Sequence, residues 1–183
     1  YASKAEDVHH SNASGIDIET ILSEGPILFQ KAKKYIGIKD SLDAHLLLVD
    51  SKIKGSTKIA VEQVYRFTLE HPKTFKKMLE DYQLLLKEAL DAYQNNEASL
   101  LGKAMNQNHQ LLQALGISEP SIDAWIEDAL NHGALGAKIT GGGLGGCFII
   151  LLQDQVQVDL LTRYYKNEGL DVRSLYLGGI KHE

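Results

Sequence analysis

The sequence predicts a domain of the α+β class, in which an antiparallel sheet packs on helices. Short apolar runs typical of buried strands stand at 44–50 and 147–152, before and after a long stretch with apolar residues at helical spacing. The 183 residues, 44% of them hydrophobic, have an ordinary globular composition and suffice for one domain with a short additional part.

The composition narrows the classes of partner. A net charge of −5 provides no basic surface, so the sequence predicts no nucleic-acid partner and no anionic membrane as main partner. No apolar run reaches the roughly 18 residues that a membrane span needs. The single cysteine, Cys147, cannot form a disulfide within the chain, which favours a reducing, cytoplasmic location.

The first quarter of the chain is polar and precedes the main domain. Residues 1–25 are rich in loop-forming types, Pro26–Lys31 is typical of a short strand, and Lys34–Asp43 is predicted to be a linker. We therefore expect two parts, residues 1–40 and the main domain 41–183.

The main domain is predicted to begin with the strand Ala44–Asp50. Ser56 or Thr57 can cap the helix that follows, and His71-Pro72 ends it because the residue before a proline avoids helical geometry. Gly116 ends the third helix, and Ser118 and Pro120 start the fourth. The predicted apolar stripes are Met78, Tyr82, Leu85, Leu86, Ala89 and Tyr93 in the second helix, Leu101, Ala104, Met105, Leu111, Leu112 and Leu115 in the third, and Ile122, Trp125, Ile126 and Ala129 in the fourth.

The remaining elements complete an antiparallel sheet. Residues 136–140 and 147–152 are strand-like, a helix is predicted over about 156–167, and 171–178 is typical of a last strand. The resulting order is strand, helices, strand, strand, helix, strand. This is the order of the ferredoxin-like, or split βαβ, fold with an enlarged first helical connection.

Between the two central strands lies Lys138–Cys147, KITGGGLGGC, in which five of ten residues are glycine. A turn between antiparallel strands needs only about two to five residues. Side-chain-free residues let backbone N–H groups approach a ligand, and successive N–H groups can form a nest that binds anions. A flexible hairpin, or a close-packed crossing of strand and helix, explains the same glycines equally well. No Lys-Ser/Thr pair of a Walker A loop follows them.

The segment GAKITGGGLGGC resembles the third conserved motif of the GHMP kinases, KxTGxGxGGC, a glycine-rich loop beside the active site. Two further stretches, 46–64 and 105–129, resemble the mevalonate kinases within that family, with GSTK before a helix and NHQLLQALGIS. Leu144 replaces a commoner glycine, and Ala13 a commoner proline. The resemblance implies the fold of the GHMP kinase C-terminal domain.

The resemblance also implies transfer of a phosphoryl group from ATP to the primary hydroxyl of mevalonate, which depends on positioning and charge stabilisation. Within HSNASGID, Asp17 matches the proposed catalytic base; helix capping explains it otherwise. Glu6 falls where relatives place a Mg²⁺ ligand, and the alternative is a solvated surface acid. The residues that the resemblance places against substrate or phosphate are His10, Ser14, Gly15, Thr140, Gly141, Gly142, Gly143 and Gly145.

Other polar residues have simpler explanations. His109 is predicted to be a polar residue satisfied inside the fold rather than a catalytic group. Cys147 is predicted to be a small buried residue that opens a core strand, and no zinc site is expected. Ser56 and Thr57 either line the site or cap their helix.

Two family features are absent from the sequence: the PxxxGLGSSAA loop that binds ATP, and the N-terminal lysine of mevalonate kinases. We expect both in an N-terminal domain of the same enzyme, so this chain alone should neither turn over nor bind ATP tightly. A homodimer is one option for the assembly. Two alternatives stay open: another GHMP small-molecule kinase, such as a galactokinase-like enzyme, and a non-catalytic ferredoxin-like module that senses a ligand.

Overall fold

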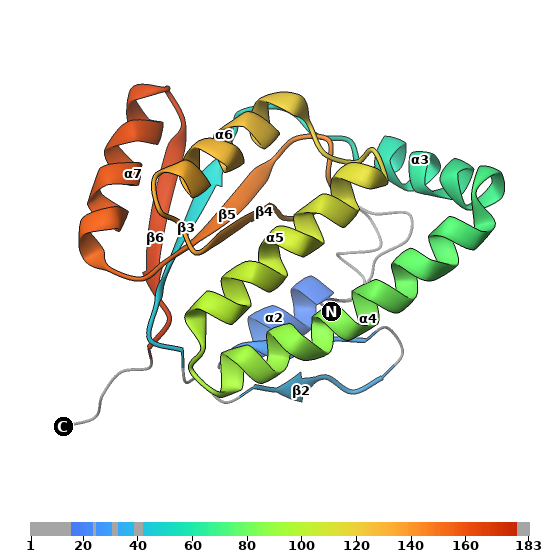
Figure 1. The fold of residues 1–183 in the computed structure, drawn as a ribbon, viewed down its shortest axis with the longest axis horizontal. Helices are drawn as coiled ribbons and strands as arrows, with labels where there is room; N and C mark the ends of the chain where they lie inside the picture. The colour runs from blue at the N-terminus through green and yellow to red at the C-terminus, as the bar shows by residue number, and fades with distance from the viewer. Residues whose placement is uncertain (1–15, 24, 31–32, 39–41, 179–183) are drawn as a thin grey trace. The chain divides into compact units, whose positions relative to one another are not determined.

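Two compact units make up the chain, residues 1–40 and residues 41–183. The computed structural model describes residues 16–23, 25–30, 33–38 and 42–178. Figure 1 draws them as helices and strands, coloured from blue near the N-terminus to red near the C-terminus. No helix in these ranges is long and apolar enough to cross a membrane.

The first unit contains a short helix and a small β-ladder among its described residues. Helix α2 spans Ile16–Leu22, and strands β1 (Ile27–Leu28) and β2 (Ile36–Gly37) pair antiparallel. The strand expected over 26–31 is therefore present in part. The predicted linker, 34–43, contains the two-residue strand β2, whose backbone groups are satisfied by pairing with β1.

The second unit is built on an antiparallel sheet whose strand order is β4-β5-β3-β6 (Figure 1). Its strands are β3 (His45–Asp50), β4 (Gly136–Ile139), β5 (Cys147–Leu152) and β6 (Asp171–Tyr176). All neighbouring strands run antiparallel, and helices connect β3 to β4 and β5 to β6. This arrangement confirms the predicted ferredoxin-like order with its enlarged first connection.

Of the helices of the second unit, all except the one that begins at Ala98 start at a side-chain cap or at a proline. Ser56 caps the first of them, because its hydroxyl accepts a hydrogen bond from the Ile59 N–H at 3.4 Å. Glu119, rather than Ser118, caps the helix that begins at Pro120. The helices are α3 (Thr57–Glu70), α4 (Pro72–Gln94), α5 (Ala98–Ala114), α6 (Pro120–Asn131) and α7 (Gln155–Asn167).

One face of the sheet packs against α6 and α7 and forms the main core. Leu47 and Val49 of β3 both point to this face, because alternate side chains of a strand lie on the same side. Tyr165 of α7 is fully buried here and stacks edge to face on Phe148. Its hydroxyl donates to the carbonyl of Trp125 at 2.7 Å, and burial raises the pKa of this phenol.

Helix α5 runs along the edge strand β4. Gly102 and Gly136 meet backbone to backbone, since a Cβ on Gly102 would overlap the carbonyl of Leu135. The Asn106 side chain covers the free edge of the strand: its Oδ1 accepts from the Ala137 N–H at 2.8 Å, and its Nδ2 donates to the Leu135 carbonyl at 3.4 Å. These bonds satisfy backbone groups that an open edge would leave unpaired.

Helix α4 packs alongside α5 (Figure 1). Of its predicted apolar stripe, Leu85 is buried, whereas Tyr82 and Leu86 are 44% and 40% exposed. The stripe is therefore only partly a buried face, because α5 covers a limited part of the circumference of α4.

Candidate functional site

The glycine loop, Thr140–Gly146, connects β4 to β5. Its backbone has positive φ at Gly141, Leu144 and three further glycines, with values of 78° at Gly141 and 57° at Leu144. Residues with a Cβ rarely adopt this left-handed region, so glycine suits most of the loop. Leu144 is the exception and requires support from its surroundings.

The connection from β3 to α3 holds one side of the loop. The Gly146 N–H donates to the Ile53 carbonyl at 2.8 Å, and the Gly146 carbonyl accepts from the N–H and the hydroxyl of buried Ser51 at 3.1 and 2.6 Å. A Cβ on Gly145 would lie 2.7 Å from both the Gly55 nitrogen and the Ile53 carbonyl oxygen. The backbones approach so closely that only glycine fits at this position.

The connection from α5 to α6 holds the other side. The Leu144 N–H donates to the Ile117 carbonyl at 2.8 Å, and a Cβ on Gly143 would lie 2.7 Å from the same oxygen. The loop is thus packed between two connections that are distant in sequence. The glycines therefore serve close packing, which was one of the two alternative explanations, as well as tight turning.

Part of the loop backbone remains open to a ligand. The structure gives no acceptor, within the described part of the chain, for the N–H groups of Gly141, Gly142, Gly143 and Gly145. Thr57, the first residue of α3, lies against Gly142, so the loop adjoins the start of that helix. Unpaired backbone N–H groups and a helix N-terminus both favour anions. The chemistry of these donors suits the phosphates of a nucleotide.

Thr140 and Lys138 lie at the end of β4, next to the loop in the sequence. The Thr140 N–H donates to the Cys147 carbonyl at 3.0 Å, while its hydroxyl has no partner among the described residues. Lys138 was not predicted as a site residue. Its ammonium donates to the Ile139 carbonyl at 2.7 Å, and burial lowers the pKa of this lysine. A lysine within the strand-like GAKIT was the signal that could have identified it.

Another lysine near the loop is already engaged by acids. Lys52 donates to Asp171, and its Nζ lies 3.6 Å from Asp50 Oδ2. The hydrogen bond to Asp171 raises the pKa of Lys52 and lowers the pKa of Asp171. Because two carboxylates neutralise it, this exposed ammonium is a poor candidate for binding a phosphate.

His109 and Cys147 both differ from expectation. His109 is 5% exposed, and its Nε2 lies 3.1 Å from Asp123 Oδ1, but the carboxylate is poorly aligned and neither ring nitrogen makes a well-directed hydrogen bond. Burial lowers the pKa of His109, and the Asp123 charge opposes this. The prediction for His109 is thus right that the residue is buried and wrong that its ring nitrogens are hydrogen-bonded.

Cys147 was predicted to be buried and is only half-buried. Burial raises the pKa of its thiol.

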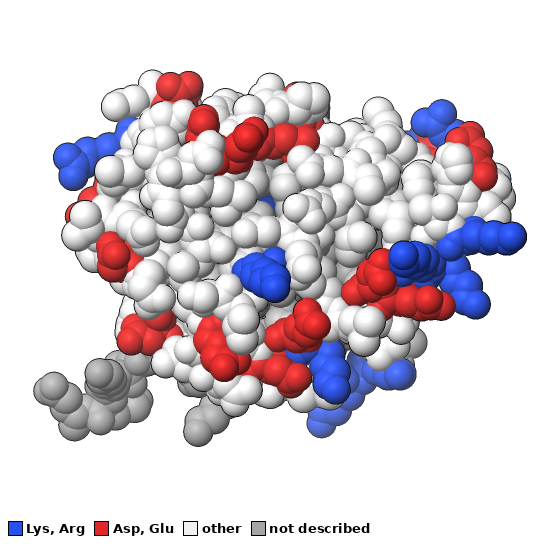
Figure 2. All heavy atoms as spheres, in the orientation of Figure 1, with Lys and Arg blue, Asp and Glu red and all other residues white. Residues whose placement is uncertain are grey.

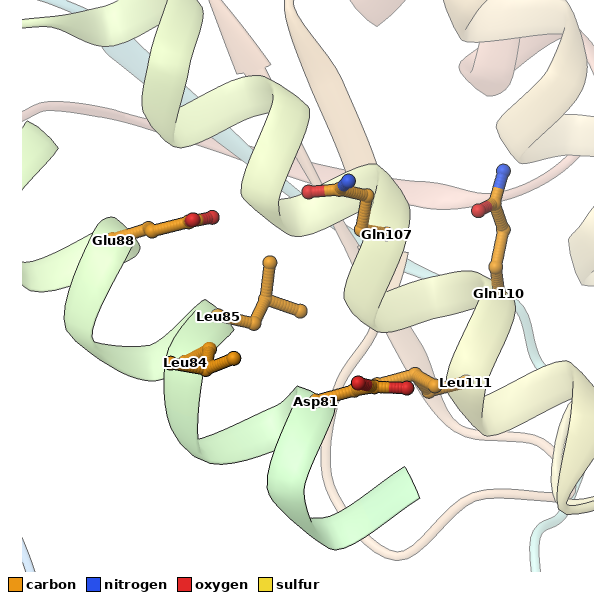
Figure 3. Close-up of a pocket in the computed structure, with 7 residues that line it drawn as sticks. All are labelled: Asp81, Leu84, Leu85, Glu88, Gln107, Gln110 and Leu111. Atoms are coloured by element: carbon orange, nitrogen blue, oxygen red, sulfur yellow. The ribbon is translucent and has the colours of Figure 1, made fainter. Parts of the chain in front are cut away.

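A pocket of about 380 Å³ between α4 and α5 lies outside this site (Figure 3). The carboxylates of Asp81 and Glu88 and the amides of Gln107 and Gln110 line it. None of its lining residues belongs to the glycine loop, and two carboxylates disfavour a phosphate by charge repulsion. The glycine loop, rather than this groove, is the candidate site.

The predicted residues near the N-terminus are not tested by the structure. Glu6, His10, Ser14 and Gly15 fall outside the described residues. Asp17 belongs to α2 by its backbone, and its side chain is outside the described part. Within the described ranges, no group of three or more His, Cys, Asp or Glu residues could hold a metal ion. The catalytic role of Asp17 and the Mg²⁺ role of Glu6 stay predictions.

Comparison with known proteins identifies relatives of this chain. The family model GHMP kinases C terminal matches residues 86–170. The mevalonate kinase of Aeropyrum pernix is 30% identical over 154 residues, covering 84% of this chain and 48% of that enzyme. The structure of L. major mevalonate kinase in complex with R-mevalonate matches with a TM-score of 0.86 at 25% identity, covering 95% of this chain and 56% of that one. The Methanococcus jannaschii mevalonate kinase matches with a TM-score of 0.79 at 27% identity, covering 96% and 54%.

The chain spans about half the length of the curated relatives it matches. The glycine loop lies inside the residues that the family model matches. The order of the strands, the position of the glycine loop and the similarity to known proteins all indicate the same domain. The chain therefore contains a GHMP kinase C-terminal domain.

Proposed function

We propose that this chain is the C-terminal part of a mevalonate kinase, which transfers the terminal phosphoryl group of ATP to the primary hydroxyl of mevalonate and forms 5-phosphomevalonate for isoprenoid precursor synthesis. The observation that carries this proposal is the glycine loop, where four N–H groups without an acceptor among the described residues adjoin the start of α3. Its support is the similarity to mevalonate kinases over 84% of the chain or more in three relatives.

The loop would contribute by binding phosphate. Backbone N–H groups fixed by close packing stabilise negative charge without having to reorganise when the charge shifts during transfer. The Thr140 hydroxyl, which has no partner in the part of the chain that the structure describes, is a further donor for a phosphate oxygen or for the base. Gly141, Gly142, Gly143 and Gly145 supply the open N–H groups.

The remaining roles fall on residues of the first unit. Asp17 would accept the proton of the mevalonate hydroxyl or orient it, since a carboxylate close to an attacking alcohol can do both. His10, Ser14 and Gly15 would contact the substrate. Glu6 would hold Mg²⁺ together with the nucleotide phosphates, and the ion would neutralise phosphate charge when bound. The N-terminal domain of the enzyme would supply the rest of the ATP site.

Two features support small-molecule substrates and a cytoplasmic enzyme. Acidic and basic side chains are interspersed over the described surface shown in Figure 2, without a continuous basic area on that face. The half-buried thiol of Cys147, with its raised pKa, suits a reducing compartment. Size-exclusion chromatography with light scattering would decide whether the full-length enzyme is a homodimer.

A related kinase with another acceptor is the second candidate. Lactococcus lactis galactokinase matches with a TM-score of 0.61 at 19% identity, which shows a shared fold alone. The test is to supply the full-length enzyme with ATP, Mg²⁺ and either mevalonate, galactose or homoserine, and to follow ADP release. Turnover with mevalonate alone is expected, and turnover with galactose in its place would overturn the proposal.

A substitution at Asp17 separates a kinase from a ligand-sensing module. Asp17→Asn should lower kcat by several orders of magnitude, because the alcohol loses its base. Asp159→Asn, which removes an exposed carboxylate of α7, is the matched control and should keep the activity. Equal kcat values for the two variants would contradict the assigned role of Asp17.

A further inference from the structure

The α5–α6 connection, residues 115–119, supports the glycine loop through one carbonyl group. That carbonyl belongs to Ile117, and it accepts the Leu144 N–H at 2.8 Å. Because Leu144 has a left-handed φ of 57°, the loop holds this conformation only while its partner stays in place. The position of Ile117 therefore sets the position of neighbouring Gly143 and its open N–H group.

Ser118, the next residue, is bound to Asp123, whose half-buried carboxylate lies beside the buried ring of His109. Its hydroxyl donates to the Asp123 carboxylate at the start of α6. Nε2 of His109, from α5, lies 3.1 Å from the same carboxylate oxygen. A single oxygen of Asp123 thus joins α5, α6 and the connection between them.

Two other hydrogen bonds fix the first part of the connection, up to the nitrogen of Ile117. The Gln63 side chain of α3 donates to the Gly116 carbonyl at 2.5 Å, and the Ile117 N–H donates to the Leu112 carbonyl at 3.2 Å. Both anchors act at or before the Ile117 nitrogen. After the Ile117 carbonyl, the next hydrogen bond that fixes the connection is the one from the Ser118 hydroxyl to Asp123.

We infer that Asp123 and His109 are positioning residues for the phosphate-binding loop, acting through Ser118 and the Ile117 carbonyl. This inference rests on the proposed function. Loss of either residue should displace the loop N–H groups from the phosphates of bound ATP. A displacement of this kind should raise the KM for ATP and lower kcat. It should leave the KM for mevalonate unchanged, because the residues proposed to contact the acceptor, His10, Ser14 and Gly15, are outside this connection.

The location of His109 offers a second readout, which is rescue by a small molecule. The ring lines a pocket of about 500 Å³ between α5 and α6, together with Gln110 and Gln113. The cavity left by His109→Ala would therefore be continuous with this pocket. Free imidazole can enter such a cavity and stand beside Asp123 in place of the missing ring.

The experiment uses full-length His109→Ala, Asp123→Asn and Ser118→Ala, with Gln110→Ala as the control that lines the same pocket. We expect kcat/KM for ATP to fall by about 10- to 100-fold in the first two and by less in the third, since a small misplacement of phosphate is costly. Imidazole should restore His109→Ala in part and leave Asp123→Asn unchanged. The KM for mevalonate should stay at the wild-type value in all four.

Two results would overturn the inference. One is wild-type kcat/KM for ATP in both His109→Ala and Asp123→Asn. The other is a loss of activity that matches the unfolded fraction by circular dichroism and does not respond to imidazole. ATP affinity measured by calorimetry separates the two proposals: an enzyme that does not phosphorylate mevalonate, but whose ATP affinity falls in both variants, would refute the proposed function and support the inference.

Discussion

The backbone N–H of Leu144 donates to the carbonyl of Ile117 at 2.8 Å and joins the glycine loop to the α5–α6 connection. This bond explains how a leucine is tolerated at φ 57°, a left-handed conformation that favours glycine. The loop is consequently a packed element whose geometry depends on residues outside the motif.

Replacing Leu144 tests the strain at this position. Leu144→Val should lower the free energy of unfolding by about 1–2 kcal/mol more than Leu144→Gly, because a β-branched side chain resists the left-handed region and glycine accepts it. Urea unfolding of the purified protein measures both values. Equal stability of the two variants would mean that residue 144 does not have positive φ.

Replacing Gly145 tests the close approach of the loop to the β3–α3 connection. Gly145→Ala should cost more than about 2 kcal/mol, since its Cβ would meet backbone atoms of Gly55 and Ile53 that cannot move aside. Gly141→Ala is the matched control: φ is 78° there, but no atom lies within 4 Å of the added Cβ. Thermal unfolding should rank Gly145→Ala well below Gly141→Ala, and the reverse order would refute the packing.

Asn106 should stabilise the edge of β4. Asn106→Ala leaves the Ala137 N–H and the Leu135 carbonyl without their partner and should cost about 1–3 kcal/mol. Hydrogen exchange of the Ala137 amide should also become faster. Asn108→Ala, two residues along α5, removes a similar amide that bonds neither group and should change this exchange rate little.

The stability of the protein should fall in mild acid because of His109. Burial lowers the pKa of this histidine in the folded state, so the unfolded chain binds the proton more readily. The corresponding stability is complete above about pH 6.5, the ordinary histidine value, and is lost as the pH falls below it. His109→Gln should weaken this loss between pH 7 and pH 5 in urea titrations. An unchanged pH dependence in the variant would contradict the assignment.

The order of elements and the ferredoxin-like sheet could be predicted from local patterns. The apolar run at β3, the helix stop before Pro72 and the glycine-separated strands β4 and β5 all appear where they were expected. Such features depend on residues that are close in sequence, so they can be recognised without coordinates. The small strand β2 escaped prediction because its two residues are stabilised by pairing with β1 rather than by their own pattern.

The candidate site could be predicted only in part. The glycine motif located the loop and its family, whereas the burial of Lys138 and the Asp123 contacts of His109 and Ser118 did not follow from any local pattern. These features depend on how α5, α6 and β4 pack together. Asp17 and Glu6 were proposed by resemblance alone and stay predictions.

By itself, the sequence determined the element order, the GHMP kinase motif and the places where glycine allows the chain to turn, because each is encoded by neighbouring residues. Only the tertiary structure decided that the loop is closely packed, which of its N–H groups have no acceptor among the described residues, and that Ile117 supports it. The physical reason is that hydrogen bonds and close contacts between distant segments form only when the whole domain packs.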